Sequence, residues 1–147
     1  MDLFICRANV WRSQCAEWFA KKFKKDVISC ASVEARKEKY FYKPEKVITD
    51  IIFKKYNIDI SKQEIYYPLD ILKDIDNLEN IYFLFDPKKA KKSDKEVLIK
   101  WKTLWEYFDS IWKKYSIYEI EDPDAKDDDT IVKIVDNINL VVNKIYS

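Results

Sequence analysis

A continuous apolar run, Ile81-Tyr82-Phe83-Leu84-Phe85, constrains the fold of this chain more than any other stretch. The run stops at Asp86-Pro87, a pair that suits a turn. A short apolar run without polar alternation is typical of a strand that is buried on both faces, as the inner strands of parallel sheets are. The run therefore predicts a central parallel strand whose sheet is covered on both sides.

Three further segments are predicted strands, and they alternate with segments of helical periodicity. These strands are Leu3–Ile5, Val27–Ser29 and Ile117–Ile120. Ser13 is the expected N-cap of a helix, because apolar residues follow it with the spacing of one helical face. The residues on that face are Ala16, Phe19, Ala20 and Phe23.

Three more helices are predicted. Pro44 suits the first turn of one of them, and Asn57 can close it in the place that glycine often takes. Its inward residues are Val47, Ile48, Ile51 and Ile52. Residues 95–115 are expected to be helical in one or two pieces, with Trp101, Trp105 and Trp112 as packing residues. The C-terminal helix carries one apolar stripe, Ile131, Ile134, Val135, Ile138, Val141, Val142 and Ile145.

Strands separated by helices of these lengths predict right-handed crossovers and a parallel sheet. The expected fold class is α/β, a three-layer sandwich with a four-stranded parallel sheet and helices on both faces. The chain has 147 residues, 48% of them hydrophobic, which suits one domain over residues 1–147. In such sheets ligands bind beyond the carboxyl ends of the strands, so a site is expected there.

The composition narrows the location and the partners. A formal net charge of +1 gives no bulk attraction to nucleic acid or to an anionic membrane. Arg7 follows the start too closely for a signal peptide, and no apolar run approaches ~18 residues, so a cytoplasmic protein without a membrane partner is expected. The three cysteines, Cys6, Cys15 and Cys30, contain no C-x-x-C pair. They are expected to be reduced thiols, with Cys15 and Cys30 in or near the core.

Two absences restrict the chemistry. The chain has no histidine, which excludes Cys-His and Ser-His-Asp catalysis and most transition-metal sites. It also has no glycine, which excludes the Walker loop and the dinucleotide-binding fingerprint. The sequence therefore predicts neither a metal nor a cofactor, and a general acid must be a carboxylate, Lys, Tyr or Cys.

The segment from Cys6 to Ser13 has the layout of an anion-binding loop that contains a nucleophile. Cys6 ends the first predicted strand, and five residues separate it from Arg12, which opens the next helix. A loop of this length can turn its backbone N–H groups toward a tetrahedral oxyanion, and the helix adds its positive end. Arg12 provides a planar fork for two phosphate oxygens, and these positive groups favour the thiolate of Cys6.

Phosphoryl transfer from an ester also needs a proton for the leaving oxygen. Asp122 follows the last predicted strand, and Pro123 stiffens its turn. The strand-end positions of Cys6 and Asp122 predict that both lie on the same rim of the sheet. Asp124 is the alternative candidate for the acid.

This combination resembles the low-molecular-weight protein tyrosine phosphatases, whose motifs are Cys-x5-Arg-Ser near the N-terminus and an Asp-Pro acid loop near the C-terminus. The resemblance spans essentially the whole chain. Cys6 to Ser13 followed by Ala16-Glu17 is similar to that family's phosphate loop and first helix. Ile28-Ser29-Cys30-Ala31 is similar to its Ser-Ala-Gly element, and Asn57 to Ser61 to its Gly-Ile-Asp-Ile-Ser turn.

The resemblance implies a cysteine-dependent phosphomonoesterase, a protein tyrosine phosphatase that acts through a phosphocysteine on a phosphorylated protein or small aryl phosphate. It implies Cys6 as nucleophile, Arg12 as the clamp on the phosphate, and Asp122 as acid and then base. Asn9 would shape the loop in the left-handed conformation, and the Ser13 hydroxyl would donate to the thiolate. The remaining loop residues, Arg7, Ala8, Val10 and Trp11, would surround the phosphate or another oxyanion.

Three positions differ from the family pattern. Ala8 stands where the family usually has glycine, and Trp11 where many members have a second cysteine able to form a protective disulfide. Asp124 replaces the aromatic residue that commonly lines the phenol pocket, so Trp11, or one of Tyr40, Phe41 and Tyr42, is the expected aromatic wall instead. Val10 is a branched apolar residue, as in tyrosine phosphatases, whereas relatives acting on phosphoarginine tend to have threonine there.

Two alternative functions remain open at this point. A thioredoxin-coupled arsenate reductase shares the implied fold and loop, but it needs additional cysteines around the third strand, and residues 81–97 contain none. A degenerate, non-catalytic phosphate-binding module is the second alternative, motivated by Ala8 and Asp124.

Overall fold

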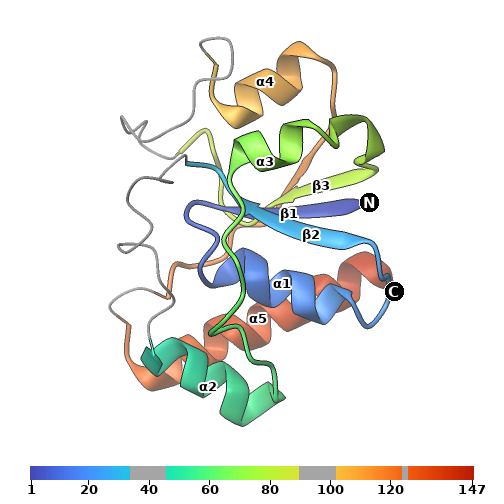
Figure 1. The fold of residues 1–147 in the computed structure, drawn as a ribbon. Coiled ribbons are helices and arrows are strands. Elements are labelled where there is room, and N and C mark those ends of the chain that lie inside the picture. The colour runs from blue at the N-terminus through green and yellow to red at the C-terminus, as the bar shows by residue number, and fades with distance from the viewer. Residues whose placement is uncertain (34–45, 90–101, 124–125) are drawn as a thin grey trace.

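The computed structural model describes residues 1–33, 46–89, 102–123 and 126–147. Four strands form one sheet in the order β2-β1-β3-β4, and every neighbouring pair is parallel (Figure 1). The strands are β1 (Asp2–Cys6), β2 (Val27–Ala31), β3 (Asn80–Phe83) and β4 (Ser116–Ile117). The predicted four-stranded parallel sheet is confirmed, with the run at residue 81 in an inner strand.

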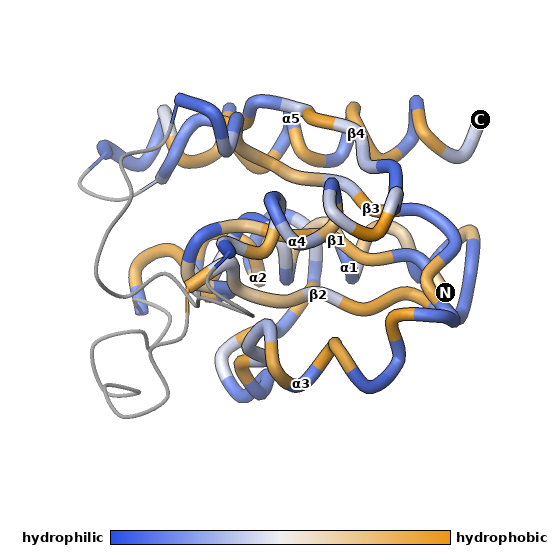
Figure 2. Tube along the Cα trace, turned by 90° about the horizontal axis from the view of Figure 1, so that it is seen from above, coloured by the Kyte–Doolittle hydropathy of each residue, from blue (hydrophilic) through white to orange (hydrophobic). Residues whose placement is uncertain are grey.

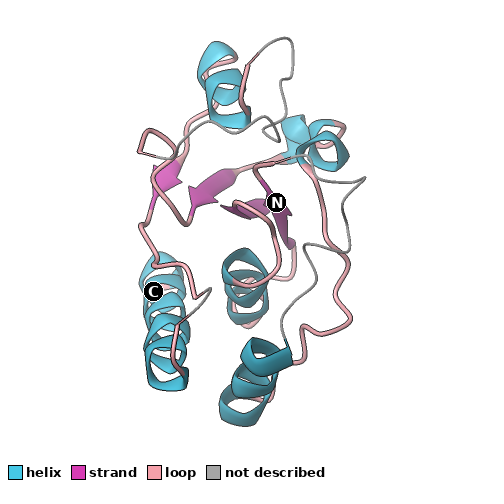
Figure 3. Ribbon diagram, turned by 90° about the vertical axis from the view of Figure 1, so that its left-hand side faces the viewer, coloured by secondary structure: helices cyan, strands magenta, loops and turns pink. Residues whose placement is uncertain are grey.

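Helices cover both faces of the sheet, which confirms the three-layer α/β fold (Figures 1 and 3). One face carries α1 (Arg12–Ala20), α2 (Lys46–Tyr56) and α5 (Asp128–Tyr146), and the other carries α3 (Pro68–Leu72) and α4 (Leu104–Ser110). A short 3-10 turn, Ile75–Asn77, precedes β3. Within the described ranges, no helix combines the length and the apolar character needed to cross a bilayer.

The strand side chains alternate between two cores. Leu3 and Ile5 of β1 pack with Leu104 and Phe108 on the α3/α4 face. Phe4 points the other way and packs against the α1/α5 face. Figure 2 shows the inner strands as mainly hydrophobic and α5 as alternating, because only one side of that helix faces the sheet. Burial of each such side chain contributes ~1.5–3 kcal/mol, so the two cores hold β1 rigidly.

Several local predictions about the first strands and helices are wrong. Ser13 is not the N-cap of α1, because the helix begins at Arg12 with Trp11 as N-cap. The Ser13 hydroxyl is instead bonded inside the loop. Phe23 lies beyond the end of α1 and is exposed. Val47 in the first turn of α2 is exposed as well, although Ile48 and Ile52 are buried as predicted.

The later elements also differ in extent. The helix predicted within residues 95–115 covers only Leu104–Ser110 in the described part, and the strand predicted at 117–120 is the pair Ser116–Ile117. Trp105 is buried as predicted, but Trp112 is 93% exposed at a φ of 60°. Asn57 closes α2 in the left-handed conformation, with a φ of 55°, which confirms that prediction. Pro44 and Trp101 lie outside the described residues.

Candidate functional site

The loop between β1 and α1 is fixed at the carboxyl end of the sheet by backbone hydrogen bonds from the residues that follow β2. The Ser32 N–H, just after β2, donates to the carbonyl of Cys6 at 2.9 Å and to that of Arg7 at 3.2 Å. The Val33 N–H donates to the same Arg7 carbonyl at 3.2 Å. Cys6 is the last residue of β1 and is buried, while Arg12 opens α1. The positive end of α1 therefore begins where the loop ends.

Asn9 is the centre of the loop's hydrogen bonding. It is fully buried and has a φ of 58°, a conformation that asparagine tolerates better than most residues. Its Oδ1 accepts the backbone N–H of Tyr66 at 3.0 Å. Because a backbone N–H can only donate, this contact fixes which end of the amide is oxygen. The Nδ2 group then donates to the hydroxyls of Ser13 at 2.7 Å and Ser29 at 2.9 Å.

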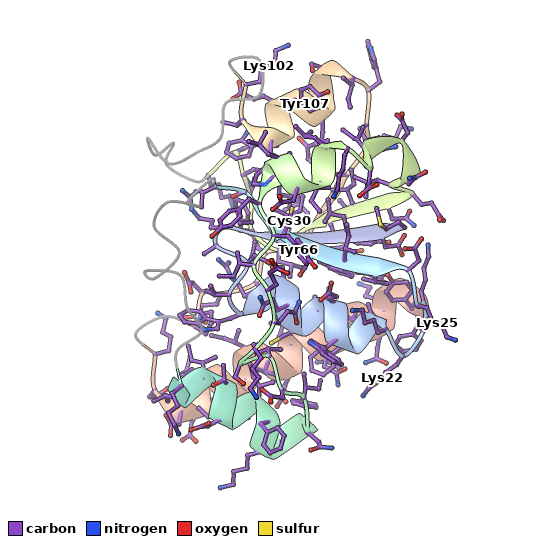
Figure 4. The ribbon with its side chains drawn as sticks, viewed as in Figure 1. Lys22, Lys25, Cys30, Tyr66, Lys102 and Tyr107 are labelled. Carbon is purple, nitrogen blue, oxygen red and sulfur yellow. The ribbon has the colours of Figure 1, made fainter. Side chains whose placement is uncertain are left out.

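The segment that holds Asn9 from outside passes the end of β2. Tyr66 lies on this segment, close to the labelled Cys30 (Figure 4). The carbonyl of Tyr66 accepts the N–H of Ala31 at 2.9 Å, which ties the segment to the edge of the sheet. Asn9 therefore connects the loop to β2 and to the chain before α3.

The Ser13 hydroxyl and the Cys6 sulfur are hydrogen-bonded. Their Oγ and Sγ atoms lie 3.0 Å apart, and both residues are buried. Since Asn9 already donates to the Ser13 oxygen, the hydroxyl proton of Ser13 is available for the sulfur. This arrangement can stabilise negative charge on Cys6.

Arg12 spans from α1 to the segment after β4. Its Nη1 donates to the carbonyl of Ile120 at 3.0 Å, and its Nη2 lies 3.9 Å from Oδ2 of Asp122. The Ile120 N–H in turn donates to the carbonyl of Leu84 at 3.0 Å, which anchors this segment to the end of β3. The Arg12 side chain is buried, whereas that of Asp122 is 58% exposed. The guanidinium is thus fixed, and the carboxylate lies at the entrance.

A cavity of about 60 Å³ opens among these groups. Its lining consists of Cys6, Arg7, Ala8, Val10, Trp11, Arg12 and Asp122. Two larger cavities, of about 440 and 290 Å³, lie along the edge of β2 between α1 and α3, and neither is lined by a loop residue. The larger one is bordered by Glu17, whose pKa is raised by burial. The small cavity is the candidate site, because among these three cavities of the described residues it is the one that joins a thiol, a guanidinium and a carboxylate.

Ala8 does not need the conformational freedom of glycine. The non-glycine residues with positive φ in the described part of the chain are Asn9, Asn57 and Trp112. Ala8 is therefore not strained, and its Cβ does not prevent the loop from closing.

The other two cysteines are buried in separate cores. Cys15 belongs to the core on the α1/α5 face, and Cys30 to the core on the α3/α4 face. Burial raises the pKa of both thiols, and the nearby Cys6 raises it further. Both are fully buried, as the sequence predicted.

The structure brings together the predicted site residues that it describes, from Cys6 through Ser13 to Asp122. Tyr40, Phe41, Tyr42 and Asp124 lie outside the described residues. Sequence reasoning gave no role to the hydroxyl of Ser29, the N–H of Tyr66 or the carbonyl of Ile120. Ser29 lies in the quoted Ser-Ala-Gly-like element and Ile120 two residues before Asp122, but no sequence signal marks a backbone group such as that of Tyr66.

Comparisons with solved structures show which known proteins share this fold. No family model matches the sequence, and no curated protein matches it. Solved structures do match. An arsenate reductase from Archaeoglobus fulgidus has a TM-score of 0.66 at 16% identity, covering 99% of this chain and 98% of that one. Wzb from Vibrio vulnificus, in complex with benzylphosphonate, has a TM-score of 0.70 at 13% identity, covering 98% and 94%.

A low-molecular-weight protein tyrosine phosphatase from T. tengcongensis also matches, with a TM-score of 0.63 at 15% identity. The match covers 97% of this chain and 95% of the phosphatase. The chain therefore has the fold that these phosphatases and arsenate reductases share.

Proposed function

We propose that this chain is a cysteine-dependent phosphomonoesterase, a protein tyrosine phosphatase that acts through a phosphocysteine. The observation that supports this most is the shared cavity of Cys6, Arg12 and Asp122, which come from the first strand, the first helix and the segment after the last strand. The proposed substrate is a phosphorylated protein or a small aryl phosphate, and the proposed location is the cytoplasm.

In the first step, the Cys6 thiolate attacks phosphorus, so that an S–P bond forms and the ester P–O bond breaks. Asp122 gives its proton to the leaving oxygen, for which its exposed position at the cavity entrance is suited. The two products are the free alcohol or phenol and a phosphocysteine.

In the second step, water attacks the phosphocysteine. The Asp122 carboxylate takes a proton from that water, the S–P bond breaks, and inorganic phosphate leaves with the Cys6 thiolate restored. The Ser13 hydroxyl, 3.0 Å from the sulfur, stabilises the thiolate as it departs.

The charge of the transferring group is carried by its equatorial oxygens in both steps. Arg12 is suited to bind two of these oxygens, because its guanidinium is planar and keeps its charge at any working pH. The bond to the Ile120 carbonyl fixes the guanidinium before substrate arrives. Preorganised charge of this kind stabilises a transition state without rearrangement of the site.

The cysteine positions support a phosphatase over a reductase. An arsenate reductase of this fold needs additional cysteines around the third strand, and residues 81–97 contain none. Cys15 and Cys30 are both buried, and burial raises the pKa of each thiol and so disfavours the reactive thiolate. The unstrained Ala8 removes one of the two arguments for a non-catalytic module.

The test is steady-state hydrolysis of p-nitrophenyl phosphate, followed with increasing vanadate and, in separate assays without vanadate, with a metal chelator. We expect turnover that vanadate inhibits and the chelator leaves unchanged. The Cys6→Ser protein should lose turnover and still bind phosphate. Cys30→Ala changes a cysteine in the core on the α3/α4 face and should retain turnover. Oxyanion binding without turnover supports the non-catalytic module, and consumption of arsenate with a thiol donor supports a reductase.

A further inference from the structure

The side chain of Trp11 borders the candidate site and carries a donor without an acceptor. Trp11 is the last loop residue before α1, it is 9% exposed, and it lines the small cavity together with Cys6 and Arg12. Its indole Nε1 is buried and has no hydrogen-bond partner in the part of the chain that the structure describes. The ring also packs in the core on the α1/α5 face, which fixes its position.

A buried donor without a partner is uncommon. More than about 90% of buried polar groups in proteins are hydrogen-bonded, because an unbonded N–H loses its hydration and gains nothing in return. Gln14 and Ser32 also carry unpartnered buried polar atoms in the described ranges, but neither lines the small cavity. Trp11 therefore differs from them in having a site for a ligand beside it.

The chemistry of the cavity indicates which acceptor the indole suits. An indole N–H can only donate, so its partner must be an acceptor. The neighbouring Arg12 guanidinium and the positive end of α1 both favour a negatively charged ligand. A tetrahedral oxyanion offers several acceptor oxygens, of which Arg12 can take two.

We propose that the Trp11 indole N–H donates a hydrogen bond to an oxygen of the tetrahedral oxyanion bound in the Cys6 loop. This inference rests on the proposed function, because it assumes that the loop binds phosphate or a phosphate ester. Trp11 then serves as a binding residue whose single, rigidly held donor helps to orient the phosphoryl group against the Cys6 sulfur.

The first test is NMR spectroscopy of the ¹⁵N-labelled protein during titration with inorganic phosphate. The chain has five tryptophans and therefore five indole N–H signals, which are assigned by triple-resonance experiments. We expect the Trp11 indole proton to move downfield as the amides of residues 6–13 shift. An unmoved Trp11 indole signal at saturating phosphate, with shifted loop amides, overturns the inference and leaves the proposed function intact. If no loop amide responds and the protein shows no turnover, both fail.

The second test compares two tryptophan substitutions in phosphate and vanadate binding. Trp11→Phe keeps an aromatic ring and removes the N–H. It should raise the dissociation constants of phosphate and vanadate by about tenfold or more. Trp18→Phe is the matched control, because Trp18 lies on α1 and its indole N–H donates to Gln63 Oε1 at 2.7 Å, outside the small cavity. It should bind within about twofold of wild type. Wild-type affinity in folded Trp11→Phe overturns the inference.

Discussion

Arg12 and Asp122 face each other across the candidate site, with Nη2 and Oδ2 separated by 3.9 Å. The other guanidinium nitrogen is bonded to the Ile120 carbonyl at 3.0 Å, so the two contacts join the first helix to the segment that follows the last strand. The carboxylate is more than half exposed and can meet a substrate that enters, whereas the guanidinium is buried. This relationship places the proposed proton donor and the proposed anion clamp at different depths of one cavity.

The proposed acid is tested with Asp122→Asn, which keeps the shape of the side chain but has no proton to give. Phosphate esters with poor leaving groups, such as phenyl phosphate, should be hydrolysed about 100-fold more slowly. Esters with good leaving groups should be affected much less, because their oxygens leave without a proton. The measurement is kcat/KM for a series of aryl phosphates, because this ratio reports the first step and does not include hydrolysis of the phosphocysteine, in which Asp122 is the proposed base. Asp124→Asn is the parallel variant, and a larger effect from it, or equal effects on all esters, would assign the acid elsewhere.

The geometry of Arg12 is tested with Arg12→Lys, which keeps the positive charge and loses the planar fork. We expect kcat/KM for an aryl phosphate to fall about 100-fold or more, because a lysine cannot hold two equatorial oxygens and the Ile120 carbonyl together. Arg12→Met should be lower still. Lys25→Met removes the same charge at the opposite end of the sheet (Figure 4) and should leave kcat/KM unchanged. A wild-type kcat/KM in Arg12→Lys would show that a positive charge at this position is sufficient without the planar guanidinium.

Asn9 allows the backbone and side-chain contributions to be separated. Asn9→Ala removes the hydrogen bonds to Ser13 and Tyr66 and places an alanine at a φ of 58°, so the free energy of unfolding should fall by about 3 kcal/mol. Asn9→Gly removes the same bonds without the left-handed penalty, and it should recover roughly 1 kcal/mol of that loss. Urea unfolding measures both.

Both Asn9 variants should also hydrolyse aryl phosphates slowly, because the Ser13 hydroxyl loses the donor that directs its proton to Cys6. Asn57→Gly is the matched control, since Asn57 has a φ of 55° at the end of α2, away from the site. It should retain wild-type activity. Wild-type activity in Asn9→Gly would mean that the loop holds its shape without the amide.

The stability of the fold should depend on pH through Asp2, a buried carboxylate in β1. Burial raises the pKa of Asp2, but hydrogen bonds from Tyr146 at 2.7 Å, Asn80 at 2.9 Å and Lys24 at 3.0 Å outweigh burial and leave that pKa below its ordinary value. A carboxyl with a lowered pKa stabilises the fold above its unfolded pKa of about 3.9, and this contribution is lost as the pH falls through the folded value.

Asp2→Asn should therefore lower the free energy of unfolding by about 1–3 kcal/mol at pH 7, and the difference from wild type should shrink below about pH 4. Urea unfolding at both pH values is the measurement. Asp50→Asn is the control, because Asp50 is exposed and paired with Lys46 on α2, and an exposed pair contributes less than about 1 kcal/mol. A difference for Asp2→Asn that persists at low pH would point to packing rather than charge.

Much of this fold follows from the sequence because apolar periodicity reports directly on burial. The run at residues 81–85 predicted an inner parallel strand, and the stripe from Ile131 to Val142 predicted the face of α5 that packs on the sheet side. Periodicity does not show where an element ends, however. Phe23 lies beyond the end of α1 and Val47 in the first turn of α2, and both are about half exposed, although the Phe23 ring stacks on Tyr146.

Other features had no periodic signal. Helix α3 has five residues, which is too short for a repeating apolar face, and only Pro68 marks its first turn. Trp112 was expected to pack because of its spacing from Trp105, but α4 ends at Ser110 and the chain turns outward.

The candidate site was predictable to the extent that its chemistry lies in side chains along one short motif. The strand end at Cys6, the left-handed Asn9 and the position of Asp122 near Arg12 all agree with what the sequence indicated. The supporting groups were not predictable, because the Tyr66 N–H and the Ile120 carbonyl are backbone atoms that any residue type could provide. For Ser13, the predicted N-cap position is wrong, whereas the hydrogen bond to the Cys6 sulfur agrees with what the family resemblance implied.

Between Cys6 and Ser13 the loop contains a single left-handed residue and no glycine. An unfolded segment in which every residue carries a Cβ samples fewer backbone conformations than one with glycine, so closing this loop costs less conformational entropy. Once closed, the loop has few alternative shapes to lose when an oxyanion enters. Binding should therefore need little backbone rearrangement, and its entropy cost should come from the lost freedom of the ligand more than from the protein.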